Sequence, residues 1–165
     1  MNQLVLSLFP GIGLLDMAFE EGGFCVVRGP DLLWGGDIRR FHPPEGKFDG
    51  VIGGPPCQTH SVMRYLAAKG NGVPAGVHGD QIPEFERCVS EARPYWLLME
   101  NVRGAPVPKV RWYEVESHLV LDVAVGGETS RLRRFSFGCQ FGHSGFHVEE
   151  LARHNSEPEA TVLAG

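Results

Sequence analysis

Short apolar segments that each end at a glycine or proline turn limit this chain to a layered α/β architecture. Leu4–Phe9 is the first such segment, and it is followed by the turn Pro10–Gly13 and by helically spaced apolar residues over 14–18. A run this short is typical of a buried strand, and glycines directly after it favour a tight turn into a helix. Repetition of the pattern predicts a doubly wound α/β fold with a mostly parallel sheet.

The chain continues this alternation to about residue 140. We expect further strands at 24–27, 48–53 and 95–99, a helix at 83–92, and a C-terminal antiparallel hairpin of 115–125 with 134–137. The strand at 24–27 is expected to be buried. Residues 58–79 show no clear pattern, and a loop of that length directly after a sharp turn is typical of a functional segment.

Length and composition predict one domain. The chain has 165 residues, 42% of them hydrophobic, which is enough for one core; we place it at 1–140, followed by a polar tail at 141–165. No apolar stretch approaches the roughly 20 residues that cross a bilayer, and the N-terminal sequence lacks the features of a signal peptide. We therefore expect a cytoplasmic protein without membrane contact.

The charge excludes a general nucleic-acid coat. The formal net charge is −5, whereas proteins that coat nucleic acids need clustered Lys and Arg to contact phosphate. Any contact with nucleic acid must therefore come from a local cluster such as Arg131, Arg133 and Arg134.

Cysteine and histidine spacing predicts free thiols and no metal centre. The four cysteines are scattered, at Cys25, Cys57, Cys88 and Cys139. Without a CxxC pair, a disulfide framework is not expected. A small zinc module would have to use Cys139, His143 and His147, with His154 nearby, but this spacing is not a standard zinc pairing. We interpret these histidines as incidental residues of a polar tail.

The first candidate site residues surround the first glycine turn. Phe9–Gly13 can leave the backbone bare for a cofactor to lie against, and Asp31, at the end of the second predicted strand, is placed to bind ribose hydroxyls. Taken alone, the glycines favour a plain strand-to-helix turn over a cofactor site.

A second candidate is Cys57. Two glycines and two prolines at 53–56 fix the backbone just before this thiol, which follows a buried strand. A thiolate is a strong nucleophile, and a rigid turn would hold it at the surface of a cleft. The alternative is a rigid turn with an incidental core cysteine.

Glu100 and the Arg131–Arg134 segment complete the candidates. Glu100 follows an apolar strand, where partial burial would favour its protonated form; the alternative is a strand-end cap. Arg131 and Arg133 are expected on one face of a strand, where they could hold a carbonyl oxygen and a phosphate, unless they form a solvated edge.

Together these motifs resemble those of the DNA cytosine-5 methyltransferase family, in the family's order. Five segments carry the resemblance: Leu8–Gly13 as the first cofactor motif, Gly36–Ile38 as the adenine-binding turn, Gly54–Gln58 as the nucleophile loop, Glu100–Val102 as the acid motif and Ser130–Arg133 as the paired-arginine motif. The resemblance covers roughly residues 4–138. It implies a Rossmann-like S-adenosylmethionine-dependent methyltransferase fold, S-adenosylmethionine as cofactor and double-stranded DNA as partner, in a bacterial or phage-infected cell.

The resemblance also implies a role for each matching residue. The cofactor would be bound by Phe9, Pro10, Gly11, Gly13, Asp31, Asp37, Ile38 and Pro55. The substrate would be bound by Gln58, Asn101 and Arg103, and catalysis would fall to Cys57, Glu100, Arg131 and Arg133. In the implied mechanism Cys57 attacks C6 of a flipped-out cytosine, Glu100 engages N3, the two arginines hold O2 and the nucleophile loop, and 58–79 closes as a lid.

Some positions depart from the family pattern. The family usually has an aspartate where this chain has Ser7, and a glutamate at the end of the second strand, where this chain has Gly29-Pro30-Asp31. The few residues between Asp31 and Asp37 leave no room for a helix. Residues 141–165 are expected to lead into, or to be a remnant of, a target-recognition region that the chain lacks, as it lacks the family's final motif.

Two alternatives share these motifs. One is a non-catalytic or split subunit that needs a second polypeptide to supply DNA recognition and the rest of the cofactor pocket. The other is an enzyme that methylates cytosine in transfer RNA, because the catalytic motifs do not distinguish the two nucleic acids.

Overall fold

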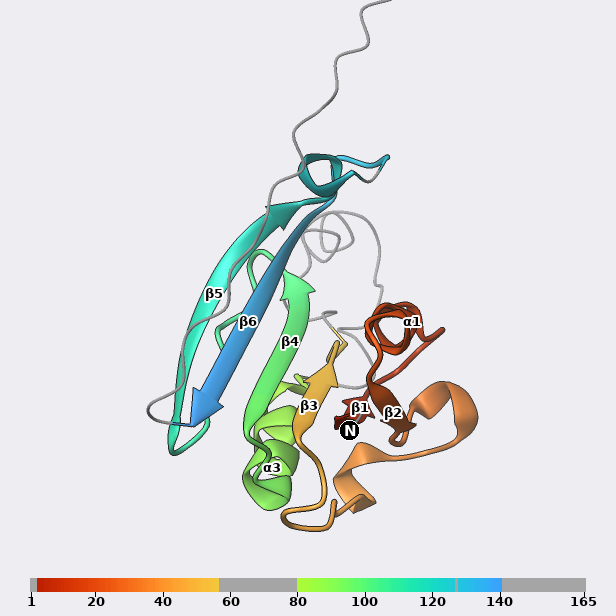
Figure 1. The fold of residues 1–165 in the computed structure, drawn as a ribbon, viewed down its shortest axis with the longest axis vertical. Helices are drawn as coiled ribbons and strands as arrows, with labels where there is room; N and C mark the ends of the chain where they lie inside the picture. The colour runs from red at the N-terminus through yellow and green to blue at the C-terminus, as the bar shows by residue number, and fades with distance from the viewer. Residues whose placement is uncertain (1–2, 57–79, 127, 141–165) are drawn as a thin grey trace, which may run out of the picture.

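The computed structural model describes residues 3–56, 80–126 and 128–140 (Figure 1). The elements follow the order β1 (Leu4–Leu8), α1 (Leu14–Glu21), β2 (Cys25–Arg28), η1 (Leu32–Trp34), η2 (Ile38–Arg40), β3 (Gly50–Gly53), α3 (Ile82–Ala92), β4 (Trp96–Val102), β5 (Tyr113–Leu121), η3 (Asp122–Val125) and β6 (Leu132–Gln140), where η denotes a 3-10 helix. The expected helix at 83–92 is confirmed. Between Asp31 and Asp37, where the sequence leaves no room for a helix, the chain forms the short 3-10 turn η1.

The six strands form one sheet in the order β2-β1-β3-β4-β6-β5. The four strands from β2 to β4 pair in parallel, whereas β6 is antiparallel to both β4 and β5. This arrangement confirms the predicted mostly parallel α/β sheet with a C-terminal antiparallel hairpin.

A helix covers each face of the parallel sheet (Figure 1). On one face, Leu8, Val51 and Met99 are buried together with Phe85 of α3. Because strand side chains alternate between faces, the intervening Val5, Ile52 and Leu98 form a second cluster with Leu15 and Phe19 of α1. The sheet is therefore wound on both sides, as predicted.

Three predictions about strands were wrong. The first strand of the hairpin was expected to run to residue 125, but β5 ends at Leu121 and a 3-10 helix follows it. The segment at 24–27 was expected to be buried, but β2 is an edge strand and its Cys25 and Val27 side chains are exposed. Strand β4 was expected to end at Met99, but it continues to Val102 because β6 pairs with it there, with Val102 opposite Arg133. Glu100 consequently lies inside a strand rather than after one.

In the part of the chain that the structure describes, no helix is long and apolar enough to span a bilayer.

Gly50 lets β3 pass beneath a tryptophan of β4. Gly50 and Trp96 are register partners, and a Cβ on Gly50 would lie 2.2 Å from Cζ2 of the indole ring. The ring is held by several contacts, stacking on Phe19 at 5.8 Å and on Phe137 at 6.4 Å between ring centroids. No side chain fits at position 50 unless this aromatic cluster moves.

We predict that Gly50→Ala lowers the free energy of unfolding by about 2 kcal/mol, because overpacking displaces the indole ring. Urea denaturation followed by circular dichroism measures the change. In a Trp96→Leu background the same substitution should cost less than half as much. An equal cost in both backgrounds would show that the ring is not the obstacle.

Candidate functional site

The candidate residues gather at the edge of the sheet where β1, β3 and β4 point. From β1 the chain crosses to β2 on one side, while β3 lies on the other side of β1. Ligands of open α/β sheets bind at such a point, where successive connections diverge. Phe9 follows β1 and Gly54 follows β3, so both stand at this edge.

The glycine turn after β1 has the conformation that its sequence predicts. Three of its residues have positive φ: Phe9 at 55°, Gly11 at 54° and Gly13 at 82°. A Cβ on Gly13 would lie 3.0 Å from the guanidinium of Arg28, while a Cβ on Gly11 would meet no heavy atom within 4 Å. The backbone at Gly11 is therefore open to a ligand, and the left-handed Phe9 marks local strain of the kind found at binding sites.

Asp31 ties the glycine turn to the segment after β2. One oxygen of its carboxylate accepts from the Gly11 amide at 2.8 Å and the other accepts from the Leu33 amide at 2.8 Å. The predicted partners Asp31 and Gly11 are thus brought together, and Asp31 also begins η1 as its N-cap.

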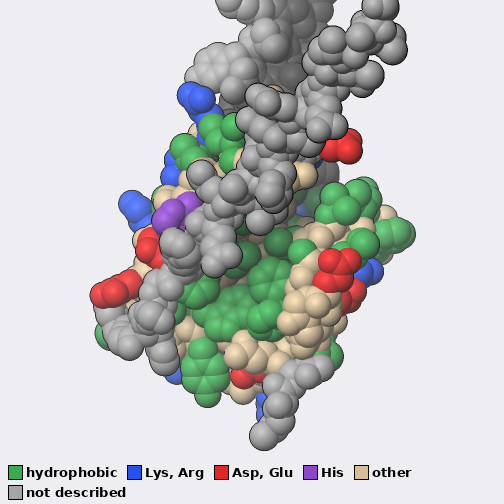
Figure 2. All heavy atoms as spheres, turned by 45° about the horizontal axis from the view of Figure 1, so that its top comes forward, with side chains coloured by type: hydrophobic (Ala, Val, Ile, Leu, Met, Phe, Trp, Pro, Cys, Tyr) green, Lys and Arg blue, Asp and Glu red, His purple; other side chains and the backbone are tan. Residues whose placement is uncertain are grey.

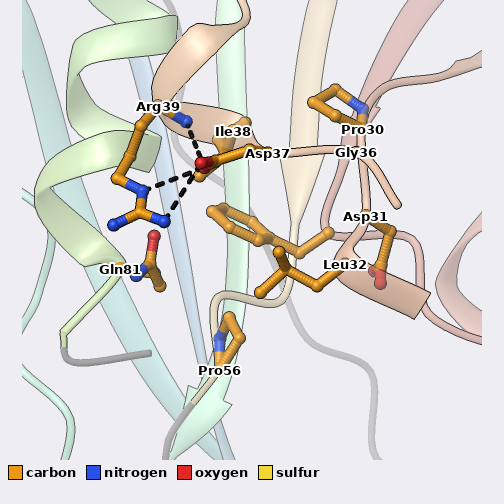
Figure 3. Close-up of a pocket in the computed structure, with 10 residues that line it drawn as sticks. Pro30, Asp31, Leu32, Gly36, Asp37, Ile38, Arg39, Pro56 and Gln81 are labelled. Atoms are coloured by element: carbon orange, nitrogen blue, oxygen red, sulfur yellow. Dashed lines mark hydrogen bonds and ion pairs between the residues drawn. The ribbon is translucent and has the colours of Figure 1, made fainter. Parts of the chain in front are cut away.

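A first pocket collects much of the predicted cofactor set (Figure 3). Its lining residues are Phe9, Pro30, Asp31, Leu32, Gly36, Asp37, Ile38, Arg39, Pro56 and Gln81. Phe9, Asp31, Asp37 and Ile38 were predicted here. Pro55 was also predicted, but it is buried and its neighbour Pro56 lines the pocket instead. Sequence reasoning gave no role to Gln81, which comes from the segment before α3.

Asp37 and Arg39 form a charged pair at this pocket. The carboxylate of Asp37 accepts from the Arg39 side chain at 2.9 and 3.0 Å and from the Arg39 backbone amide at 3.1 Å (Figure 3). These hydrogen bonds, chiefly those from the side chain, hold the pKa of Asp37 below its ordinary value. The carboxylate is therefore an acceptor at neutral pH.

Arg87 of α3 holds the Asp37 segment in place. Its guanidinium donates to the carbonyl oxygens of Ile38 at 2.8 Å and Phe41 at 3.1 Å, and it is paired with Glu84 and Glu91 on its own helix. Sequence reasoning missed this residue because it acts between segments far apart in the chain.

A second pocket lies at the same edge of the sheet. It is lined by Ser7, Leu8, Phe9, Pro10, Ile12, Leu14, Leu15, Asp16, Gly54 and Glu100. Phe9 lines both pockets, so the two hollows adjoin through one residue. Pro10, a predicted cofactor contact, lines this second pocket.

Glu100 enters the second pocket as one partner of an ion pair. Nε of Arg133 lies 2.8 Å from its carboxylate, and the two side chains are 24% and 31% exposed. A Cβ on Gly54 would lie 3.4 Å from Glu100 Oε2, so the carboxylate reaches over the end of β3. The carboxylate therefore has a guanidinium as its direct neighbour in this pocket.

Three other predicted site residues lie in or beside β4 and β6, and they differ in burial. Asn101 is buried and donates to the carbonyl oxygen of Pro55 at 3.2 Å, so it holds the turn after β3 where a substrate contact was expected. Arg103 and Arg131 are exposed. Arg134 donates to the carbonyl oxygen of Arg103 at 2.9 Å, so basic side chains gather near this end of the hairpin.

Two predicted residues, Cys57 and Gln58, lie outside the described residues, as does the predicted lid at 58–79. Among the cysteines that the structure describes, Cys25 is exposed, whereas Cys88 and Cys139 are buried. His143, His147 and His154 also lie outside, and the described residues hold no group of three potential metal ligands.

The fold recurs in solved methyltransferase structures. A mutant of DNMT2 from Spodoptera frugiperda aligns over 84% of this chain and 50% of its own, with a TM-score of 0.59 and 18% identity. The Dnmt2 methyltransferase of S. pombe aligns over 88% of this chain and 52% of its own, with a TM-score of 0.57 and 15% identity. At such identities the likeness concerns the fold.

Sequence comparison finds similarity to bacterial methyltransferases. The chain is 34% identical to Type II methyltransferase M.FnuDI of Fusobacterium nucleatum over 116 residues, which cover 61% of this chain and 32% of the relative. It is 34% identical to Type II methyltransferase M.AquIA of Picosynechococcus sp. over 131 residues, which cover 63% and 50%. The chain thus spans a third to a half of the length of these relatives. Residues 34–111 match the model of the C-5 cytosine-specific DNA methylases.

Proposed function

We propose that this chain forms the cofactor-binding and catalytic part of a DNA (cytosine-5) methyltransferase that uses S-adenosylmethionine and Cys57. The observation that carries the proposal is the pair of adjoining pockets at the edge of the sheet, with the Glu100–Arg133 ion pair at the second of them. Type II methyltransferases are the relatives that match by sequence.

The residues of the first pocket fit the nucleoside end of S-adenosylmethionine. Phe9, Leu32 and Ile38 offer apolar surface for an adenine ring. Asp31 and Asp37 supply carboxylate oxygens, which accept from ribose hydroxyls and from an exocyclic amine. The open backbone at Gly11 allows the rest of the molecule to pass toward the second pocket. Bound there, the cofactor supplies an electrophilic methyl group.

Glu100, which lines the second pocket, fits a role in the activation of cytosine. C5 of cytosine is a weak nucleophile until a thiolate adds to C6. The Cys57 sulfur forms the bond to C6, and the displaced electron pair is stabilised as Glu100 engages N3 and the arginines engage O2. C5 would then take the methyl group as the methyl–sulfur bond of the donor breaks, which leaves S-adenosylhomocysteine. The C5 proton would pass to a base, and the C6–sulfur bond would break so that Cys57 leaves as the thiolate.

Arg133 positions Glu100 in this scheme because the two side chains are already paired. Arg131, which is exposed just before β6, remains available for O2 or for a phosphate. Asn101 fixes the Pro55 turn from which the nucleophile loop begins. Gln58 and Arg103 are assigned to the DNA.

Cys57 is the nucleophile because the other thiols are unsuited. Burial raises the pKa of the Cys88 thiol to about 11, so this group is neutral and unreactive at physiological pH. Cys139 is buried in β6, and Cys25 is exposed on the edge strand β2. None of these three lines either of the two pockets, whereas Cys57 directly follows Pro56, which lines the first.

The substrate base must leave its stack, because neither the thiolate nor the methyl donor can reach a ring inside a duplex. With a formal net charge of −5, contacts to the DNA backbone depend on local basic residues. Arg103 and Arg134 lie together near the end of β4, the strand that carries Glu100, and we assign them to phosphate.

The face of the sheet on which α1 packs supports the alternative in which a second polypeptide completes the active unit. Figure 2 shows hydrophobic side chains gathered across one face, with charged ones mainly around its margin. Among the described elements, α1 alone packs on the Val5, Ile52 and Leu98 cluster, and Trp96, Phe135 and Phe137 stay only partly buried there. We propose that this face receives a partner chain, which would also supply DNA recognition.

The described thiols should react with iodoacetamide at very different rates. In the folded protein at pH 7.5 we expect Cys25 to be modified and Cys88 and Cys139 to be protected, with Cys88 reacting only as the pH approaches about 11. Peptide mass spectrometry after timed quenching measures each rate. Modification of Cys88 as fast as Cys25 would contradict its assignment as an inert thiol.

The reaction itself is tested with duplex DNA that contains 5-fluorocytosine, because fluorine at C5 blocks elimination and traps the adduct. We expect a covalent complex that requires S-adenosylmethionine, is lost in Cys57→Ala and persists in the matched control Cys25→Ala. Methyl transfer by Cys57→Ala at the wild-type rate would refute the proposal.

The same assay separates the alternatives. An adduct with 5-fluorocytosine RNA in place of DNA would identify a transfer RNA enzyme. Cofactor binding without an adduct on either nucleic acid, followed by activity when a partner chain is added, would identify a split subunit.

A further inference from the structure

An open groove lies beside β5, which is the outermost strand of the sheet (Figure 1). The groove encloses about 450 Å³, and it shares no lining residue with the two pockets of the candidate site. Three valines, a tyrosine and two basic residues are among the side chains that line it: Val107, Lys109, Val110, Arg111, Tyr113 and Val115. We call this hollow the β5 groove. Nothing in the scheme above uses it.

The segment that forms the β5 groove is held firmly against the rest of the fold. The backbone amide of Lys109 donates to Oε1 of Glu86 on α3 at 2.6 Å. Val110 is buried in the core cluster that contains α3, and the hydroxyl of Tyr113 donates to the carbonyl oxygen of Pro94. The groove is therefore a fixed part of the molecule.

The two basic side chains of the groove are available to a ligand. Lys109 and Arg111 are exposed, and neither forms an ion pair with another residue that the structure describes. The guanidinium of Arg111 lies 4.4 Å from the centroid of the Trp112 ring. Stacking of this kind orients a guanidinium and leaves the N–H groups at its edge to donate. An apolar groove with two such cations fits a segment that carries both apolar and acidic side chains.

The chain that follows β6 has this complementary composition. Residues 141–165 contain four glutamates and one arginine, with neither aspartate nor lysine. Within them, residues 146–151 read Phe-His-Val-Glu-Glu-Leu, so that two adjacent carboxylates stand among three apolar residues. Residues 141–165 lie outside the described part of the chain.

Strand β6 delivers this segment to the β5 groove. Its last residue, Gln140, is the register partner of Tyr113, which lines the groove. The six residues from there to Phe146 reach at most about 20 Å when extended, so the segment starts within range of the groove. A short tether raises the effective concentration to the order of millimolar, and contacts too weak to join separate molecules then suffice.

We propose that residues 146–151 of this chain bind in the β5 groove. Glu149 and Glu150 face Lys109 and Arg111, and the apolar side chains of the segment lie against the valines. The contact fastens the chain after β6 to the end of the β5–β6 hairpin that lies away from Glu100. It is an interaction surface beyond the proposed function, because it uses no residue assigned to the cofactor, to catalysis or to DNA.

Photo-cross-linking in the full chain identifies what occupies the groove. Phe146 is replaced by p-benzoylphenylalanine, an aromatic residue that bonds to its neighbours under ultraviolet light, and peptide mass spectrometry locates the bond. We expect cross-links within one chain to residues 107–115. Glu149→Lys with Glu150→Lys should lower their yield by about fivefold or more, because two ion pairs become repulsive contacts. Glu157→Lys with Glu159→Lys, the matched control from the same tail, should change the yield by less than about twofold.

A charge exchange separates recognition from damage to the fold. Lys109→Glu with Arg111→Glu should lower the yield as the Glu149 and Glu150 reversal does. All four substitutions together should restore most of it, since opposite charges face each other again. Thermal unfolding checks that each variant is folded, and a misfolded groove would not be rescued by charges on the tail.

Three results would overturn the inference. One is the absence of cross-links to residues 107–115, including their replacement by bonds to another part of the chain. Another is cross-linking to a second copy, seen as a doubled mass on a denaturing gel, which would make the groove an interface between molecules. The third is a yield that the charge variants leave unchanged or that the fourfold exchange does not restore.

Discussion

The parallel pairing of β1, β3 and β4 brings the candidate residues Phe9, Gly54 and Glu100 to one edge of the sheet. Leu8 pairs with Gly53, and Gly53 pairs with Met99, so the three strands reach the edge of the sheet in step. A shift of this register by one residue would exchange the two faces of a strand and bury the wrong side chains. Glycines at 50 and 53 permit the close approach, because a Cβ at either position would lie within 3 Å of a neighbouring atom.

Charge at this edge is arranged in pairs. Asp37 is paired with Arg39, Asp16 with Arg28 and Glu100 with Arg133, each at 2.8 or 2.9 Å. Each carboxylate is thereby fixed in direction before a ligand arrives, and preorganisation of this kind lowers the cost of binding. The acidic surface expected from a net charge of −5 is consistent with selective, local contact to a nucleic acid.

Local patterns predicted much of this site, and tertiary pairing supplied the rest. Glycine and proline turns after apolar runs located Phe9 and Asp31, because those signals are local. Asp37 was expected only from the resemblance of Gly36–Ile38 to the family's adenine-binding turn. Burial of β2 was predicted wrongly because an edge strand and a central strand can share one apolar pattern. The Glu100–Arg133 pair depends on β6 returning beside β4, and Arg87 acts across the fold. The sequence gives one indication of Asp16: a carboxylate stands between Leu15 and Phe19, which pack on the core. Amphipathic spacing alone does not explain a charge at that position.

A crystal structure of the chain with S-adenosylhomocysteine would examine how the two pockets divide one ligand. We expect adenine between Phe9 and Ile38, ribose near Asp31, the chain of the amino acid passing the open backbone of Gly11, and sulfur directed toward the Glu100 side of the second pocket. Ligand bound away from Phe9, or reversed so that adenine occupies the pocket beside Glu100, would contradict the arrangement proposed for this protein.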